Sequence, residues 1–154
     1  MARLDGAWDG PALADFLDSA RIPVRLACRT PAGRLWMVSL WFTPTDGDPL
    51  GFACATSARA RLVAYLRADA EVAFEISTNQ PPYRGVRGVG TAAISTDTDK
   101  ALLGSLLERY LGGTDSDLAT RLLAPERREV RIDVTADRLY TWDFTGRMPA
   151  RGED

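Results

Sequence analysis

The chain contains no histidine, and only one of its 19 basic residues, Lys100, is a lysine. Histidine is the usual general base near pH 7, because its ordinary pKa lies close to neutrality. Its absence excludes a Ser-His-Asp triad and a Cys-His nucleophile pair. If the protein is an enzyme, we therefore expect a bound cofactor to carry the reaction.

The sequence is also poor in cysteine, with Cys28 and Cys54 both in apolar, strand-like runs. In a reducing compartment, such cysteines are small buried hydrophobes more often than disulfide partners. Two cysteines without a histidine are also too few for an ordinary zinc site. We expect no metal site.

Long apolar runs are absent as well. The chain has no segment long enough to cross a membrane, and its start has no apolar core of signal-peptide length. These features predict a cytoplasmic protein with no membrane partner. The net charge of −2, without a clustered basic excess, likewise gives no reason to expect a nucleic-acid partner.

The length and composition that remain are those of one soluble globular domain. The chain has 154 residues, of which 45% are hydrophobic and 26% are charged, enough to bury one full core but too few for two domains of ordinary size. We predict a single domain over 1–154, with an ordered core over about 10–146 and a loose polar tail over 147–154.

Hydrophobic periodicity predicts about seven short strands with helices between them. The expected strands are 22–30, 34–42, 50–56, 71–78 and 84–95, followed by two strands within 128–144 around a turn at 135–137. The expected helices are 10–20, 59–67, 97–111 and 115–123. Hairpin-like connections favour a mainly β fold, an antiparallel barrel with flanking helices, over a βαβ sheet.

The stretch "GVRGVG" has three glycines, as a dinucleotide fingerprint does, but these glycines at 85, 88 and 90 do not follow the G-x-G-x-x-G order. The residues that follow are strand-like rather than a helix start, so the required context is missing. We interpret these glycines as marks of a strongly curved barrel strand.

The stretch "ATSARAR" is a better candidate for an anion site. Thr56 or Ser57 could cap the helix that follows, and Arg59 and Arg61 could add charge-assisted hydrogen bonds to an anion. The alternative is a capped helix whose arginines pair with nearby acidic residues or face solvent. The aromatic residues likewise allow two interpretations, a flat ligand pocket or ordinary core, for Trp36, Trp41, Tyr83, Tyr140 and Trp142.

Four segments in order resemble the pyridoxamine 5′-phosphate oxidase-like family, the FMN-binding split barrels. They are "GRLWMVSLWF", "GFACATSARARLVAYLRADAEVAFEI", "YRGVRGVGTAAI" and "VRIDVTADRLYTWDF", which together cover about 20–145. The resemblance implies a six- to seven-stranded antiparallel split β-barrel. It also implies a homodimer with two equivalent cofactor sites in the dimer interface.

The resemblance also implies the cofactor-binding residues. The strand residues Trp36, Met37, Val38, Ser39 and Leu40 would run along the flavin ring. Thr56 and Arg61 match the threonine and arginine that bind the cofactor phosphate in this family. Leu62 stands where the family often has a lysine, and Ser57 or Arg59 could replace its contribution.

Two departures exclude a vitamin B6 oxidase proper. Gly85 stands where those enzymes carry a glutamine that reaches the flavin, and the C-terminal segment has no histidine to pair with an arginine. We predict instead an oxidoreductase that uses FMN, or alternatively a deazaflavin, to exchange hydride with an unknown small molecule. Tyr83, Arg84 and Trp142 are the expected substrate-pocket residues, and no side chain stands out as an acid or base. The competing hypothesis is a carrier of flavin or haem without turnover.

Overall fold

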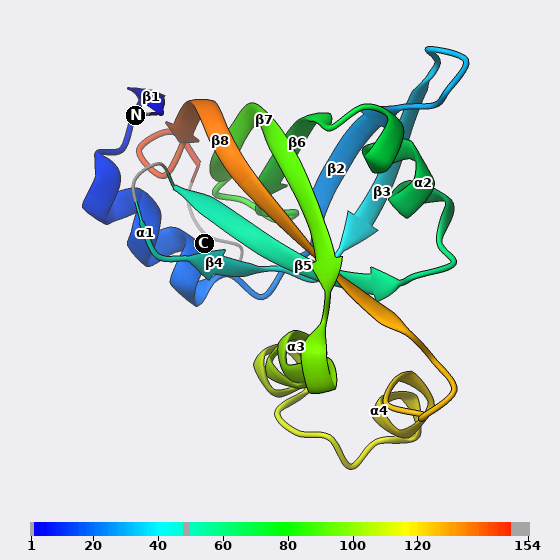
Figure 1. Ribbon diagram of the computed structural model, residues 1–154. Coiled ribbons are helices and arrows are strands. Elements are labelled where there is room, and N and C mark those ends of the chain that lie inside the picture. The colour runs from blue at the N-terminus through cyan, green and yellow to red at the C-terminus, as the bar shows by residue number, and fades with distance from the viewer. Residues whose placement is uncertain (1, 48–49, 149–154) are drawn as a thin grey trace.

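The computed structural model describes residues 2–47 and 50–148, which form an eight-stranded sheet and four α-helices (Figure 1). In chain order the elements are β1 (Arg3–Gly6), α1 (Gly10–Ser19), β2 (Val24–Arg29), β3 (Leu35–Leu40), β4 (Thr43–Thr45), β5 (Gly51–Ser57), α2 (Arg61–Ala68), β6 (Glu71–Ser77), β7 (Arg84–Thr96), the 3-10 turn η1 (Thr98–Lys100), α3 (Ala101–Leu111), α4 (Asp117–Leu122) and β8 (Glu129–Asp143). The predicted tail lies mostly outside the described residues.

The sheet follows the order β3-β2-β6-β7-β8-β5-β4, and its two outer strands do not pair with each other. It is therefore a barrel that remains open along one side, and every pair in this path is antiparallel. This confirms the predicted mainly β split barrel. The strand count is higher than predicted because β4 is a separate short edge strand and β1 adds to β8 in parallel.

The last segment is one strand of 15 residues, so the prediction of two strands around a turn at 135–137 is wrong. Both halves of β8 pair with the same strand, β7, and the register shifts by one residue between Val89 and Gly90. Val89 pairs with Arg138 and Gly90 with Ala136, which leaves Asp137 as a bulge. The polar residues therefore bend the strand without reversing it.

The glycines of "GVRGVG" are required by this close packing of strands. A Cβ atom at Gly88 would lie 2.4 Å from the carbonyl oxygen of Arg138 and 2.7 Å from the Phe74 ring. At Gly90 it would lie 2.2 Å from the carbonyl oxygen of Thr135. No side chain fits at either position, so these glycines serve the curvature of β7.

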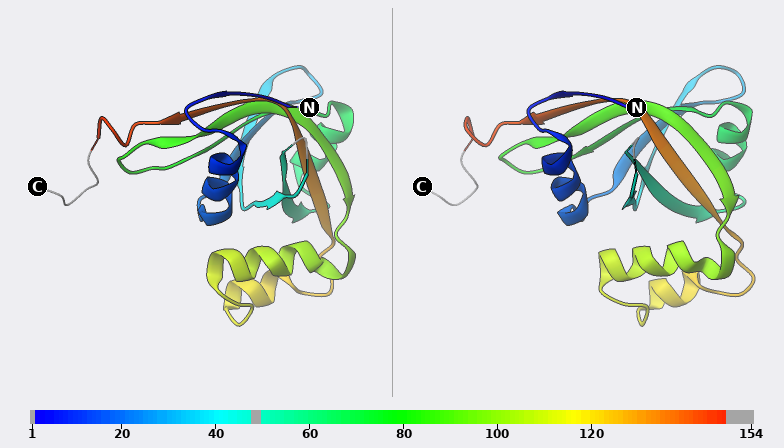
Figure 2. Two further views of the ribbon diagram at one scale, coloured as in Figure 1. Left: turned by 90° about the vertical axis from the view of Figure 1, so that its left-hand side faces the viewer. Right: turned by 60° about the vertical axis from the view of Figure 1, so that its left-hand side comes forward.

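Alternating strand residues fill the barrel interior with one continuous apolar core. Its largest fully buried members include Leu26, Phe42, Ile76, Val86 and Ile132. Figure 2 shows α3 and α4 together at one end of the barrel, whereas α1 and α2 lie at other places on its surface. Among the described residues, no helix is long and apolar enough to cross a membrane.

The predicted helix over 97–111 is broken near its start. Asp99 and Lys100 adopt left-handed backbone angles, with φ of 56° and 54°, so that η1 and α3 are separate elements. Asp97 then acts as a distant cap, because its two carboxylate oxygens accept the backbone N–H groups of Leu102 and Leu103, each at 3.0 Å. This arrangement fixes where α3 begins and which face it turns to the barrel.

The N-terminal segment is attached to the end of β8 through Asp143. The carboxylate of Asp143 accepts hydrogen bonds from the Thr145 backbone N–H at 2.9 Å, from the Thr145 hydroxyl, and from the Trp8 indole at 3.1 Å. The Thr145 hydroxyl, above all, lowers the pKa of Asp143; Trp8 and the positive charge of Arg84 act in the same direction. The ionised carboxylate is thus the form that the fold stabilises.

We expect Asp143→Asn to lower the free energy of unfolding by about 1 kcal/mol at pH 7, the usual worth of such hydrogen bonds. Because the folded pKa is lowered, the stabilisation is complete above the unfolded pKa of about 3.9 and is lost as pH falls through the folded pKa. Urea unfolding at a series of pH values measures the difference. The exposed Asp137→Asn is the matched control; a wild-type advantage that persists in strong acid would contradict the assignment.

Candidate functional site

A groove of about 300 Å³ lies where the ends of β3 and β5 meet α3 and α4. Its polar side carries the hydroxyl groups of Ser39, Thr56 and Ser57, together with Arg127 and Glu129. Its apolar side is formed by Trp41, Leu103, Leu106 and Leu122. A flat apolar body with a polar chain suits such a groove, because each half meets side chains of its own kind.

The apolar wall is held in place by aromatic stacking and by one tyrosine hydroxyl. Trp41 stacks on Tyr110 with ring centroids 5.1 Å apart and an interplanar angle of 8°. The Tyr110 hydroxyl lies 2.9 Å from the carbonyl oxygen of Ile22 and accepts the Phe42 backbone N–H at 3.2 Å. Burial raises the pKa of this hydroxyl, so it remains protonated and able to donate. It therefore joins α3 to the chain before β2 and after β3.

The polar wall contains a buried ion pair that sequence reasoning missed. The Glu129 side chain is 1% exposed, and one of its oxygens accepts two hydrogen bonds from Arg127, at 3.1 Å from Nε and 2.8 Å from Nη2. Glu129 pairs with Ser57 across β5 and β8, which places the ion pair beside the groove's hydroxyls. The sequence signal for this pair was the spacing of Arg127 and Glu129 by two residues at the start of a strand, which puts both side chains on one face.

The predicted ring-binding residues of β3 point to two sides of the strand. Met37 and Ser39 are exposed, whereas Trp36, Val38 and Leu40 are half-buried toward the core. Only Ser39 and Leu40 line the groove. Since β3 is an edge strand, its backbone groups on the side away from β2 have no strand partner within the described chain and could contact a ring.

Trp36 is a half-buried member of this group with an unsatisfied donor. Its ring packs edge-on against Tyr65 of α2, with centroids 5.6 Å apart. The indole N–H is buried and has no hydrogen-bond partner in the part of the chain that the structure describes. Such donors are rare in native proteins, so this side chain is a place where a ligand or water is expected.

The predicted anion site is built differently from the expectation. Helix α2 begins at Arg61, and its cap is Ala60, so neither Thr56 nor Ser57 caps it. Ser57 instead accepts the Arg59 backbone N–H at 3.3 Å. Arg59 and Arg61 are exposed, form no ion pair with the described residues, and do not line the groove that Thr56 and Ser57 line. Their role as phosphate ligands remains a prediction.

Leu62 does not face a phosphate site. It is 3% exposed and packs in the main core with the other apolar residues of α2. Its position follows from the helical spacing of Leu62, Val63 and Leu66, which puts all three on the buried face. A lysine introduced here would place its charge against the core, so the absence of lysine gives no information on phosphate affinity.

The predicted substrate residues lie at the other end of the sheet. Arg84 pairs with Asp143 and Trp142 with Gly85 at the far end of the β7–β8 ladder. The near end, Thr96 with Val130, lies next to Glu129 at the groove. Twelve residue steps along a strand correspond to about 40 Å of chain path. One protomer therefore does not bring Tyr83, Arg84 and Trp142 to its own groove.

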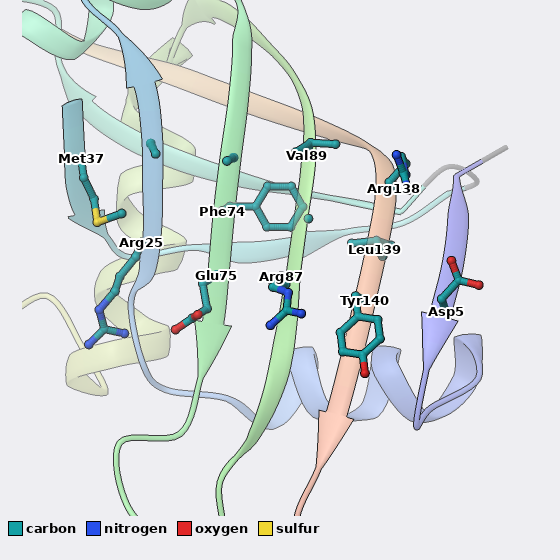
Figure 3. Close-up of a pocket in the computed structure, with 13 residues that line it drawn as sticks. Asp5, Arg25, Met37, Phe74, Glu75, Arg87, Val89, Arg138, Leu139 and Tyr140 are labelled. Atoms are coloured by element: carbon teal, nitrogen blue, oxygen red, sulfur yellow. The ribbon is translucent and has the colours of Figure 1, made fainter. Parts of the chain in front are cut away.

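A second hollow, of about 500 Å³, lies on the outer face of β2, β3, β6, β7 and β8 (Figure 3). Figure 3 shows Met37, Glu75, Arg87, Val89 and Tyr140 on neighbouring strands of this face. Met37 is 63% exposed, Tyr140 45% and Val89 42%. The Arg87 guanidinium lies 4.7 Å from the centre of the Tyr140 ring. This face therefore presents apolar and aromatic side chains to solvent.

We expect Arg127→Gln to lower the free energy of unfolding by about 2–3 kcal/mol, because it leaves the buried Glu129 carboxylate without its cation. Glu129→Gln should cost about 1 kcal/mol, since Arg127 is partly exposed and can turn to water. The double variant should lose less free energy of unfolding than the two single variants lose in sum. Urea unfolding of all four proteins completes the cycle. Additive losses would show that the two side chains do not interact.

Comparison with known proteins gives results at the level of structure. No protein-family model matches the chain, and no curated protein matches it significantly. A conserved hypothetical protein of Mycobacterium tuberculosis is 24% identical, with a TM-score of 0.72 over 94% of this chain and 90% of that one. An F420 reductase is 20% identical, with a TM-score of 0.69 over 86% of this chain and 98% of that one.

A third similar structure is an FAD-binding protein of Mesorhizobium loti, which is 16% identical. Its TM-score is 0.60, over 86% of this chain and 92% of that one. At these low identities, structural similarity over nearly the whole of each chain shows a shared fold. The chain therefore has the split-barrel fold of the pyridoxamine 5′-phosphate oxidase-like proteins, the superfamily that its sequence resembles.

Proposed function

We propose that the protein binds FMN, or alternatively a deazaflavin, in the groove between β3, β5, α3 and α4. The observation that carries the proposal is the mixed lining of this groove. Hydroxyl groups and the Arg127–Glu129 ion pair line it together with aliphatic side chains and Trp41. Structural similarity to an F420 reductase and to an FAD-binding protein supports a flavin-type ligand.

The residues present fit such a cofactor. Trp41, Leu103 and Leu106 would pack on the flat ring and exclude water, while the free backbone edge of β3 would hydrogen-bond its polar rim. Thr56 and Ser57 would hold the phosphate-bearing chain, with Arg61 supplying charge from the start of α2. When bound, the ring supplies hydride chemistry, and the protein orients it toward the substrate.

The proposed activity is that of an oxidoreductase acting on a small molecule in the cytoplasm. The groove's only carboxylate among the described residues is Glu129, and Arg127 already pairs with it. The protein's own contribution is therefore binding, orientation and exclusion of water, with no side chain assigned as acid or base.

The charge of the site separates the two cofactors. FMN ends in a phosphate that is a dianion near neutral pH, whereas the deazaflavin F420 continues through a monoanionic phosphodiester into an acidic tail. Arg61 is the one predicted cationic phosphate ligand with a counterpart in the family, and Leu62 points into the core. FMN stays the first choice, because Thr56, Ser57 and Arg59 add donors around a terminal phosphate.

The homodimer is part of the proposal, because an open groove of about 300 Å³ covers only part of a flavin-sized ligand. The exposed outer face, with Met37, Val89 and Tyr140, is the surface that a second copy would cover. Tyr83, Arg84 and Trp142 would then reach the cofactor from the partner, since their own groove is too distant along the ladder.

The second candidate is a carrier that binds flavin or haem without turnover. Among the residues that the structure describes, the groove has no unpaired carboxylate, which favours this candidate over a catalyst that needs proton transfer. Haem is the weaker of its two ligands. The chain has no histidine, and burial raises the pKa of both Cys28 and Cys54, so neither thiol is available as a thiolate.

Fluorescence titration with FMN and with the deazaflavin tests the site. We expect Ser57→Ala and Thr56→Val to weaken binding about three- to tenfold each, the worth of one hydrogen bond to an anion or sugar hydroxyl. Thr43→Val on β4 is the matched control, because Thr43 is half-buried but does not line the groove. Equal affinities for all four proteins would place the cofactor elsewhere.

Light scattering after gel filtration tests the dimer. We expect Val89→Arg to convert the dimer to monomer and to weaken cofactor binding, because a charge added among the exposed apolar side chains of this face would be costly to desolvate on association. Leu111→Arg also replaces an exposed apolar residue with arginine, but on α3 and outside the outer face. It should leave both the dimer and cofactor binding unchanged. A wild-type protein that is monomeric at micromolar concentration would disprove the interface.

A further inference from the structure

A second polar cavity, of about 520 Å³, lies behind the Arg127–Glu129 ion pair. It is bordered by the end of α2, by the η1 turn and by the start of β8. Arg127 and Glu129 line both this cavity and the cofactor groove, so the ion pair is the wall between them. The basic side chains around the cavity are Arg67, Lys100, Arg127 and Arg128.

Two of these four cations are already engaged. Arg127 pairs with Glu129, and the Lys100 ammonium donates to the carbonyl oxygen of Ala124. Arg67 and Arg128 have no side-chain hydrogen bond or ion pair with any residue of the described ranges 2–47 and 50–148. Two guanidinium groups are therefore available to a ligand.

The carboxylates of the cavity do not cancel this charge. Glu129 is neutralised by Arg127, and both oxygens of Asp97 accept backbone N–H groups at the start of α3. Asp99 is exposed and is the remaining negative group in the lining. Two unpaired arginines against one solvated aspartate leave a local excess of positive charge, in a protein whose net charge is −2.

The floor of the cavity is fixed by an unusual backbone. Asp99 and Lys100 are consecutive left-handed residues other than glycine, a strained conformation that persists only where the surroundings impose it. The Lys100 hydrogen bond to Ala124 and the backbone hydrogen bond from Asp97 to Glu129, at 3.1 Å, hold this turn against β8 and the segment after α4. The η1 turn that borders the cavity is thus tied to the start of β8 and to the segment after α4.

We propose that this cavity binds an anionic group, a phosphate or a carboxylate, between Arg67 and Arg128. Arginine suits both groups, because its planar fork donates two parallel hydrogen bonds. The anion has two possible sources. One is the acidic extension of the cofactor in the adjoining groove, an assignment that rests on the proposed function; the other is a free acidic small molecule, which does not.

Calorimetric titration with inorganic pyrophosphate at low ionic strength tests the site without any cofactor. We expect Arg67→Gln and Arg128→Gln each to weaken pyrophosphate binding about three- to tenfold, since both side chains are partly hydrated. Arg121→Gln removes an exposed arginine of α4 that does not line the cavity, and should leave the affinity unchanged. Added salt should weaken pyrophosphate binding to the wild-type protein more than binding to the double variant that combines Arg67→Gln and Arg128→Gln.

The source of the anion follows from two further titrations, with the tailed deazaflavin and with the same ring and sugar-alcohol chain lacking the phosphodiester and tail. If the double variant binds the tailed deazaflavin more weakly than the wild type does, but binds the tail-less form equally well, the anion is the cofactor's acidic extension. An effect on pyrophosphate but on neither deazaflavin identifies a free acidic ligand. If pyrophosphate does not bind, or if Arg121→Gln weakens it as much as the other variants, the proposal is wrong. Pyrophosphate binding without any flavin binding would refute the cofactor groove alone.

Discussion

The β7–β8 ladder is the interaction on which the rest of the structure depends. Thirteen residues of β7 pair with β8, which also pairs with β5 and β1 and so joins both halves of the split barrel. The ladder can curve this strongly because Gly88 and Gly90 remove side chains where the strands come closest, and because the bulge at Asp137 absorbs one residue of register. Its two ends lie beside two sets of polar residues: Glu129 and the groove at one end, and Asp143 with its neighbours at the other.

This geometry explains why one chain does not bring all of the predicted site residues together. A long ladder holds its ends apart, so the polar residues around Arg84 and Trp142 cannot approach the groove lined by Thr56 and Ser57. A second copy related by a two-fold axis can bring the end of one ladder to the groove of the other, because each copy offers the same surface to its partner. The uncovered outer face around Val89 gives that copy an apolar area to bury.

Much of this fold could be predicted from period-2 alternation in the strands, and the split barrel from four segments in order. The errors have local causes. The stretch around Asp137 contains the polar residues of a turn, but pairing with a continuous partner strand outweighed that local preference. Thr56 and Ser57 were expected to cap a helix, yet they end β5, because pairing with β8 extends through Ser57. Ser39 and Thr56 were predicted as cofactor-binding residues, and both line the groove. Arg127 and Glu129 were missed, because only the tertiary structure shows that the start of β8 lies beside the hydroxyl groups of β5.

In the proposed site, the ion pair between Arg127 and Glu129 would have a role that neither charge could have alone. A buried carboxylate beside a cofactor phosphate would repel it, and a free arginine there would bind any anion without regard to orientation. Paired, the two present a nearly neutral wall to the groove, while Arg67 and Arg128 keep their charge on the far side. In the proposed arrangement, the groove would hold the flat ring and its phosphate-bearing chain, and the next cavity would hold a further acidic group. A phosphate at the start of α2 and an acidic group beyond the ion pair would then be recognised by different arginines. Such a site would discriminate between ligands by the length and the charge of the chain that follows the ring.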